Sequence, residues 1–129
     1  MNVNISIDIP ISRIADLVCN CFEGSYSPWI GSANLAPGEH AIPGLVFWAQ
    51  PLLYEQPRFG IVVTYDGPDD DEGSFASQKT ITLEDLRKGL ELMAKEEPYQ
   101  FGNFLSDNDD AITADTFMQL VVLGEVVYG

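Results

Sequence analysis

Apolar and polar side chains alternate strictly over the first residues of the chain. Isoleucine or valine occupies every odd position from Val3 to Ile9, polar residues stand between them, and Pro10 follows. A period of two is typical of a β-strand with one buried face, and proline ends such a strand because it has no backbone N–H. The pattern therefore predicts a half-buried strand over residues 3–9.

The apolar positions then change to helical spacing. Residues 12–23 place apolar side chains three and four positions apart, with Ser12 suited to cap the start and Gly24 suited to a left-handed end. On such a helix Cys19 and Cys21 lie about 200° apart around the axis, so they cannot share a bond or a metal ion. We therefore expect two unbridged, reduced thiols, as in a cytosolic protein.

A second helix is predicted over residues 83–96. Thr82 and Asp85 resemble a capping box, with Asp in place of the usual Glu or Gln, and Pro98 ends the element. Residues 99–105 predict a further short helix.

The last predicted helix covers residues 114–123. Thr113 is suited to cap its start, and Gly124 is suited to end it. Its side chains are apolar on most sides, so we expect this helix to be largely buried.

The middle of the chain predicts a loop followed by strands. Residues 24–44 are rich in Gly and Pro and predict a loop or short extended pieces, whereas residues 45–48 and 59–65 are β-rich. Residues 75–81 predict a returning strand, so that the acidic segment 66–73 becomes the tip of a hairpin. The order of elements predicts an α+β fold, a small antiparallel sheet with three to four helices packed against it.

Composition limits the classes of protein that fit. The 129 residues suit a single domain over 1–129, and 46% hydrophobic residues with two Trp, five Tyr and seven Phe exclude a disordered acidic tail. No apolar run reaches the roughly 20 residues of a membrane span, and the first residues lack a secretory signal. We therefore expect a cytoplasmic protein that is not bound to a membrane. Because its net charge is −14, we also expect no direct binding to nucleic acid.

The negative charge is concentrated in one part of the chain. Fourteen of the twenty acidic residues lie between Asp66 and Asp115, where only four basic residues occur. Such a concentration suits either a solubilising surface or a surface that meets a basic partner. The candidate partner-binding residues are Asp66, Asp69, Asp70, Asp71, Glu72, Glu96, Glu97, Asp107, Asp109 and Asp110.

Catalytic and metal-binding signatures are weak. His40 stands beside Glu39 in a Gly/Pro-rich segment, but no nucleophile motif accompanies this pair. The acidic segments 66–73 and 107–110 both depart from the calcium-loop pattern, because acids and glycine fall at the wrong positions. We expect no enzymatic activity, no cofactor and no dedicated metal site.

A DNA mimic is physically compatible with this charge. Duplex DNA carries one negative charge per roughly 1.7 Å of its axis, and the proteins that bind it present Lys and Arg. A folded protein that holds carboxylates rigidly at similar density can occupy the same basic groove, with less ordering entropy to lose than an acidic tail.

Two parts of the chain are informative when they are taken together. The first consists of Ile14–Cys19 and Phe22–Gly24, and the second of Gly89–Ala94, Phe104–Leu105, Asn108–Asp110, Asp115, Gln119–Leu120 and Leu123–Gly129. They resemble small acidic proteins encoded by phages and prophages, most of which have no assigned activity, whereas residues 25–80 depart from that pattern. Some small acidic phage proteins are anti-CRISPRs that imitate DNA, and this chain is similar to one of the type I-C class.

The resemblance implies a phage-encoded inhibitor of bacterial defence with no catalytic residues. As a DNA mimic it would block target-DNA binding by a CRISPR surveillance complex such as Cascade. Two alternatives stay open. One is a phage structural or assembly accessory that binds protein through apolar residues, for which Trp29, Trp48 and Tyr54 are candidates. The other is a small metal-dependent protein that uses its carboxylates.

Overall fold

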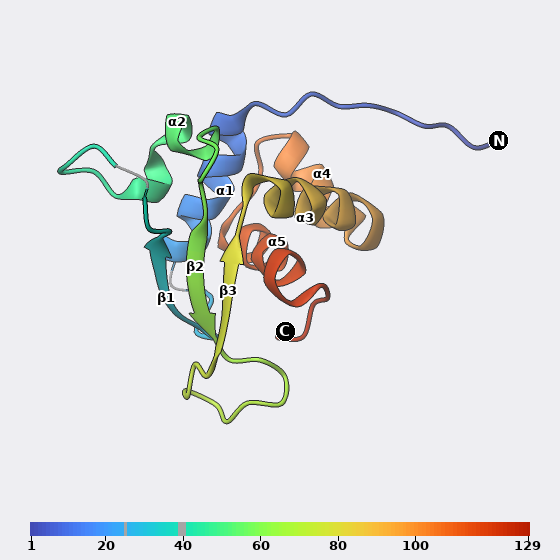
Figure 1. Cartoon of the computed structure of the whole chain (residues 1–129). Coiled ribbons are helices and arrows are strands. Elements are labelled where there is room, and N and C mark those ends of the chain that lie inside the picture. The colour runs from blue at the N-terminus through green and yellow to red at the C-terminus, as the bar shows by residue number, and fades with distance from the viewer. Residues whose placement is uncertain (25, 39–40) are drawn as a thin grey trace.

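The computed structural model describes residues 1–24, 26–38 and 41–129 of the chain. It shows a three-stranded antiparallel sheet with helices packed around it, which confirms the predicted α+β class (Figure 1). The elements are α1 (Ile11–Glu23), β1 (Ile30–Leu35), the 3-10 helix η1 (Phe47–Ala49), α2 (Pro51–Tyr54), β2 (Ile61–Tyr65), β3 (Ser77–Ile81), α3 (Leu83–Glu96), α4 (Pro98–Leu105) and α5 (Ala111–Leu123).

The sheet has one buried and one open face. The strand order is β1-β2-β3, and Val63 of the central strand pairs with Ala33 on one side and with Lys79 on the other. Val63 is fully buried, whereas its neighbour Thr64 points to the open face and shares a 2.7 Å hydrogen bond with Ser32. This alternation is typical of an antiparallel sheet that is covered on one side.

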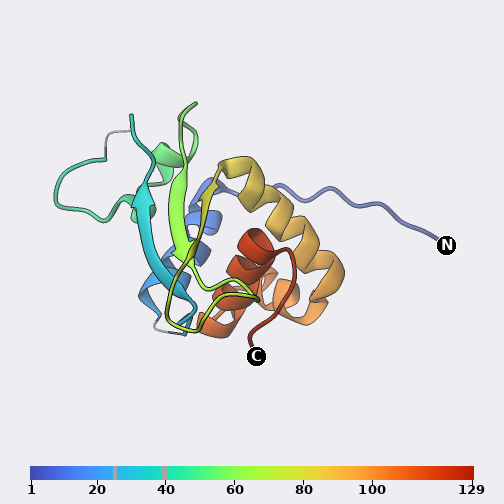
Figure 2. The ribbon, with the colours of Figure 1, turned by 60° about the horizontal axis from the view of Figure 1, so that its bottom comes forward.

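Helix α5 forms the centre of the core, between α1 and α3 (Figure 2). Every residue from 113 to 122 is buried, with Phe117 and Met118 fully so, which confirms the prediction from its apolar sequence. Gly89 of α3 allows the two helices to approach closely, because a Cβ atom there would overlap Cγ2 of Val121. Among the described residues, no helix combines the length and the apolar character that a membrane crossing requires.

The predicted helices are confirmed, with corrections at their ends. Helix α3 has the predicted bounds, and its Thr82–Asp85 capping box is formed. Helix α5 starts three residues earlier than predicted because Asp110, not Thr113, is its N-cap, and Thr113 completes the capping box from inside the first turn. Gly124 is left-handed as expected, with φ 78°.

Helix α1 begins and ends differently from its prediction. Its N-cap is Pro10 and not Ser12, and no side chain caps it. Gly24 has φ −81°, so the left-handed end is wrong. A side chain would still be excluded there, because a Cβ atom at Gly24 would overlap the carbonyl oxygen of Asn20.

Two predicted strands are absent from the described structure. Residues 3–9 are extended but pair with no strand, and their apolar side chains stay exposed, at 68% for Val3, 77% for Ile5 and 49% for Ile7. Residues 45–48 lead into η1 because Trp48 packs its ring on Phe22 of α1, at 5.3 Å between ring centroids. The Gly/Pro-rich segment supplies an actual strand, β1, and the hairpin formed by β2 and β3 is confirmed with shorter arms.

Candidate functional site

The acidic hairpin tip, residues 66–73, projects from the body at the bottom of Figure 1. Asp66 begins the tip and is only 5% exposed. Its carboxylate accepts hydrogen bonds from the backbone N–H groups of Gly73 and Phe75, both at 2.8 Å. Asp66 is therefore the internal brace of the turn, and it presents little charge to a partner.

Asp70 is the second brace. Its Oδ2 accepts from the Gly67 backbone N–H at 2.8 Å and from the Ser77 hydroxyl at 2.6 Å. These bonds, led by that of Ser77, lower the pKa of Asp70. The two braced aspartates hold both ends of the tip in one conformation, which Gly73 completes with a φ of 81°.

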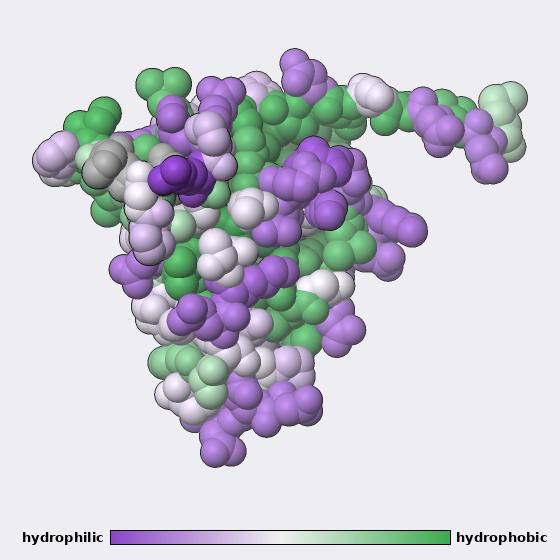
Figure 3. Space-filling view, viewed as in Figure 1, coloured by the Kyte–Doolittle hydropathy of each residue, from purple (hydrophilic) through white to green (hydrophobic). Residues whose placement is uncertain are grey.

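The remaining tip acids are free for other contacts. Asp69, Asp71 and Glu72 are exposed, and no side-chain hydrogen bond or ion pair within residues 1–24, 26–38 and 41–129 engages their carboxylates. The tip stands out as a hydrophilic end in the space-filling view (Figure 3). These three carboxylates form a compact negative surface on a braced support.

A buried carboxylate lies behind the tip, and the sequence pattern did not single it out. Asp115 of α5 is only 6% exposed, and it accepts from Ser27 at 2.5 Å, from the Trp29 indole N–H at 2.8 Å and from the Gln119 amide at 2.8 Å. One signal could have shown it: an Asp with a Gln four residues later, inside an otherwise apolar helix.

Gln119 extends this polar cluster to the segment that follows α5. Its Oε1 accepts from the backbone N–H groups of Val127 and Tyr128, at 2.8 and 2.9 Å, and its amide donates to the Tyr128 carbonyl at 2.9 Å. The Tyr128 hydroxyl then donates to the backbone carbonyl of Asp66 at 2.8 Å. The hairpin tip is thus tied to α5 through Tyr128.

Between the tip, α5 and the Tyr128 segment lies a pocket of about 580 Å³. Its walls combine aromatic rings with carboxylates and contain no basic residue. Burial, followed by the charges of Asp66, Asp70 and Glu72, raises the pKa of Tyr128. Such a lining suits a cationic group with an apolar stem, such as a lysine or arginine side chain. The lining residues are Tyr26, Pro28, Trp29, Asp66, Gly67, Pro68, Asp70, Glu72, Asp115, Tyr128 and Gly129.

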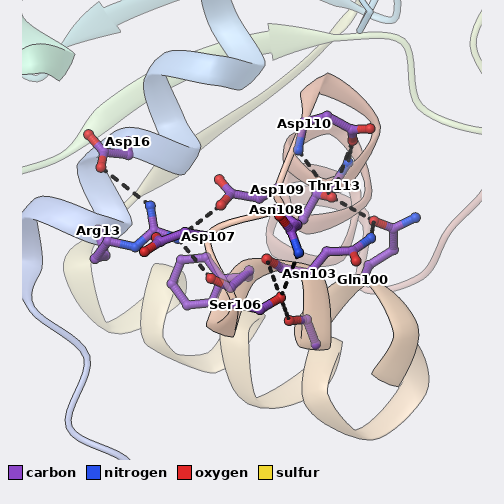
Figure 4. A network of polar contacts seen from close by, with 12 residues as sticks. Arg13, Asp16, Gln100, Asn103, Ser106, Asp107, Asn108, Asp109, Asp110 and Thr113 are labelled. Carbon is purple, nitrogen blue, oxygen red and sulfur yellow. Dashed lines mark hydrogen bonds and ion pairs between the residues drawn. The ribbon is translucent and has the colours of Figure 1, made fainter.

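The second predicted acidic cluster is engaged inside the fold (Figure 4). Arg13 of α1 pairs with Asp109 at 2.9 Å and with Asp107 at 3.1 Å, and it donates to the Phe104 carbonyl at 2.8 Å. The Asp109 side chain is only 6% exposed. Asp110 caps α5, and its hydrogen bonds to Thr113 lower its pKa. Of this cluster, only Asp107 is an exposed carboxylate without a capping role, and it too faces an arginine.

The structure therefore separates the predicted acids into groups. The 107–110 group lies between α4 and α5, beside the start of α1, where Arg13 pairs with Asp109, and none of its residues lines the pocket next to the hairpin tip. Glu96 and Glu97 lie at the junction of α3 and α4, where Glu96 is exposed and Glu97 half-buried. The tip is the one place where three exposed predicted acids fall within four residues of the described chain.

The cysteines and the other candidate reactive side chains lie outside the acidic tip. Cys19 and Cys21 are unbridged, and burial raises their pKa values to about 11 and about 12. Both thiols are therefore protonated near neutral pH, which is the less nucleophilic form. Among the described residues, no three His, Cys, Asp or Glu side chains are grouped to hold a metal ion. Glu39 and His40 lie outside the described residues.

Comparison with known proteins adds no relative. No family model matches the chain, and neither the curated proteins nor the solved structures contain a match.

Proposed function

We propose that this protein inhibits a bacterial defence system as a DNA mimic, by occupying the basic groove with which a CRISPR surveillance complex binds target DNA. The observation that carries the proposal is the braced hairpin tip, with Asp69, Asp71 and Glu72 exposed on it. Carboxylates on a rigid support lose little ordering entropy when they bind, and a net charge of −14 steers the approach to a basic surface.

The pocket beside the tip gives this surface a second means of recognition. A lysine or arginine of the groove that enters the pocket meets the Trp29 and Tyr128 rings and the braced carboxylates behind them. Solvated charge pairs at the tip contribute little each, whereas a partly desolvated cation contributes more. The carboxylates of the tip therefore attract the basic groove, and the pocket fixes where on the groove the protein binds.

A competition assay tests the proposal. A purified type I-C surveillance complex is loaded with labelled target DNA, and displacement is measured against increasing concentrations of the protein. Replacing Asp69, Asp71 and Glu72 by Asn, Asn and Gln should weaken inhibition by roughly 3- to 150-fold, because each of the three exposed pairs contributes about 0.2–1 kcal/mol. The double reversal Asp69→Lys with Asp71→Lys should weaken it further, because attraction becomes repulsion.

A matched control separates position from net charge. Replacing Asp8, Glu55 and Glu125 by Asn, Gln and Gln removes the same charge from three exposed sites away from the tip. Equal loss of inhibition in both triple variants contradicts docking through the tip. Full inhibition that persists at about 0.5 M salt, where the Debye length is about 4–5 Å, contradicts an electrostatic mechanism.

One observation favours a second candidate, a phage accessory module that binds protein through apolar side chains. The apolar residues Val3, Ile5 and Ile7 are exposed. The aromatic residues considered for this role are less suited to it, because Trp29 and Tyr54 are buried and Trp48 is half-buried. Binding that is insensitive to salt and lost when Ile5 and Ile7 are made polar would favour this candidate.

A further inference from the structure

The extended segment 1–9 carries the pattern of a strand but has no strand beside it. None of the hydrogen bonds found among the described residues involves its backbone. Residues 5–9 line a cavity together with residues of α3 and α4, and the first residues of the segment run away from the body (Figure 1). Its odd residues are apolar and its even residues polar, so one face is suited to burial and the other to water.

The sheet offers an edge that matches this segment. β1 is an outer strand, and β2 occupies only one of its sides. A groove of about 190 Å³ follows the other side, because four consecutive β1 residues, Ile30–Ala33, line it. The register of β1 shifts between Ile30 and Ser32, but Ser32 still pairs with Thr64 on the open face and Ala33 with Val63 on the covered face. A cavity that contacts both therefore lies along the backbone edge.

The floor of this groove is apolar, and one of the residues that line it carries a donor without a partner. Phe22 of α1 and Trp48 of η1 line it. The indole Nε1–H of Trp48 is the one buried side-chain polar atom within the described residues that lacks a hydrogen-bond partner. A buried donor without an acceptor is costly, and the carbonyl of an added strand is the kind of group that would satisfy it.

We propose that residues 3–9 of a second copy of this chain add to the free edge of β1, and that the exchange is reciprocal. Odd residues of the incoming strand then share the covered face with Ala33 and Leu35, over Phe22 and Trp48. Even residues join Ser32 and Asn34 on the open face. The incoming segment of seven residues matches the six residues of β1, and reciprocal exchange closes a two-fold dimer.

Charge favours a second copy over a basic partner at this edge. β1 has no charged side chain, and segment 3–9 has only Asp8. The hairpin tip reaches β1 only at its start, beside Trp29, and no acidic residue lines the groove itself, so two acidic chains can join along this strip with little repulsion. A basic protein would gain no ion pair with β1 itself. This inference does not depend on DNA mimicry.

The test compares two arm variants by light scattering coupled to size exclusion. The wild-type chain should show twice the 14.2 kDa of one chain at tens of micromolar. Ile5→Asp with Ile7→Asp places two carboxylates on the face to be buried, and should raise the dimer dissociation constant by about 100-fold or more. Asn4→Asp with Ser6→Asp adds the same charge to the open face and should leave the dimer nearly intact.

Disulfide trapping identifies the acceptor edge. Copies with Ser6→Cys mixed with copies with Asn34→Cys should form a linked heterodimer, because both residues lie on the open face. Ile5→Cys, which faces the other way, should link poorly. Trp48→Phe should weaken the dimer, because the indole donor is lost.

Several results would overturn the proposal. These are a monomer at all concentrations, a dimer equally sensitive to both arm variants, or efficient linking of Ser6→Cys to Asn34→Cys within one doubly substituted chain. The last result would mean that the arm folds back on its own edge. The substituted arm positions 4–7 are exposed in the single chain, so we expect these variants to fold and each result to be interpretable.

Discussion

Replacing Asp115 by Asn tests whether the buried carboxylate holds the site together. The change keeps the shape of the side chain and removes one acceptor. Asn Oδ1 can still accept from Ser27 and Trp29, but its amide faces the Gln119 amide, so two donors meet where one hydrogen bond existed. Gln119 cannot turn over without losing its bonds to Val127 and Tyr128.

The expected loss follows from these contacts. A hydrogen bond to a charged group contributes about 1.5–3 kcal/mol, and the unpaired buried donors add to the loss. We expect the free energy of unfolding to fall by about 2–4 kcal/mol, and Tm by about 6–15 °C for a chain of this size. Urea and thermal unfolding followed by tryptophan fluorescence measure both, since Trp29 is buried against this group.

The control is Asp69→Asn, which makes the same chemical change at an exposed acid of the tip. It should shift Tm by less than about 2 °C, because surface changes rarely exceed 0.5 kcal/mol. Equal Tm values for the two variants would show that the Asp115 bonds contribute nothing net, and the account of the polar cluster would be wrong.

Three further predictions concern other parts of the fold. Because folding lowers the pKa of Asp70, its carboxylate stabilises the folded state above the unfolded pKa near 4, and this stabilisation is lost as the pH falls through the folded pKa. Asp70→Asn should therefore make the free energy of unfolding depend less on pH in the acid range. An unchanged dependence contradicts this. Gly89→Ala should lower the free energy of unfolding by about 1–3 kcal/mol, because the new Cβ overlaps Val121. Gly102→Ala, which has open space around it, should raise the free energy of unfolding by up to about 1 kcal/mol. Equal effects of the two variants in thermal melts would refute the packing argument. The Cys21 thiol, with its pKa near 12, should react with a disulfide reagent at pH 8 only after unfolding, and fast reaction of the native protein would contradict its burial.

Local signals in the sequence predicted the elements whose stabilisation is local. The Thr82–Asp85 box and the apolar face behind it lie within one helix, so the bounds of α3 followed from the sequence. The start of α5 did not, because Asp110 and Thr113 are both good caps and the choice depends on the packing of the preceding loop. The extended stretch at β1 was allowed for in the prediction of short extended pieces over residues 24–44, but its place in the sheet was not predicted, because that comes from pairing with β2 and not from its own residues.

The site was predicted only in part for the same reason. Counting acids located the hairpin tip, but charge in the sequence does not show which carboxylates turn inward. Asp109 is turned inward by Arg13, which is distant in sequence, and Asp66 by the backbone N–H groups of Gly73 and Phe75, whose positions depend on the conformation of the folded tip. Asp115 was hidden because its donors come from Trp29 and Ser27, more than eighty residues away. Segment 3–9 shows the opposite case, a clear strand pattern whose partner strand lies outside the single chain if the proposed exchange is correct.

The bond from Tyr128 to Asp66 has a consequence for the order of folding. It joins residues 62 positions apart, and the Gln119 bonds that position Tyr128 require α5 to be docked already. Closing so long a loop costs entropy that only the completed core offsets. We therefore expect the amides of Gly73 and Phe75 to become protected from hydrogen exchange late in refolding, after those of α3 and α5. The acidic tip then reaches its final conformation only after the core has folded. Partly folded chains therefore carry the same charge, but their carboxylates are not held in the native arrangement.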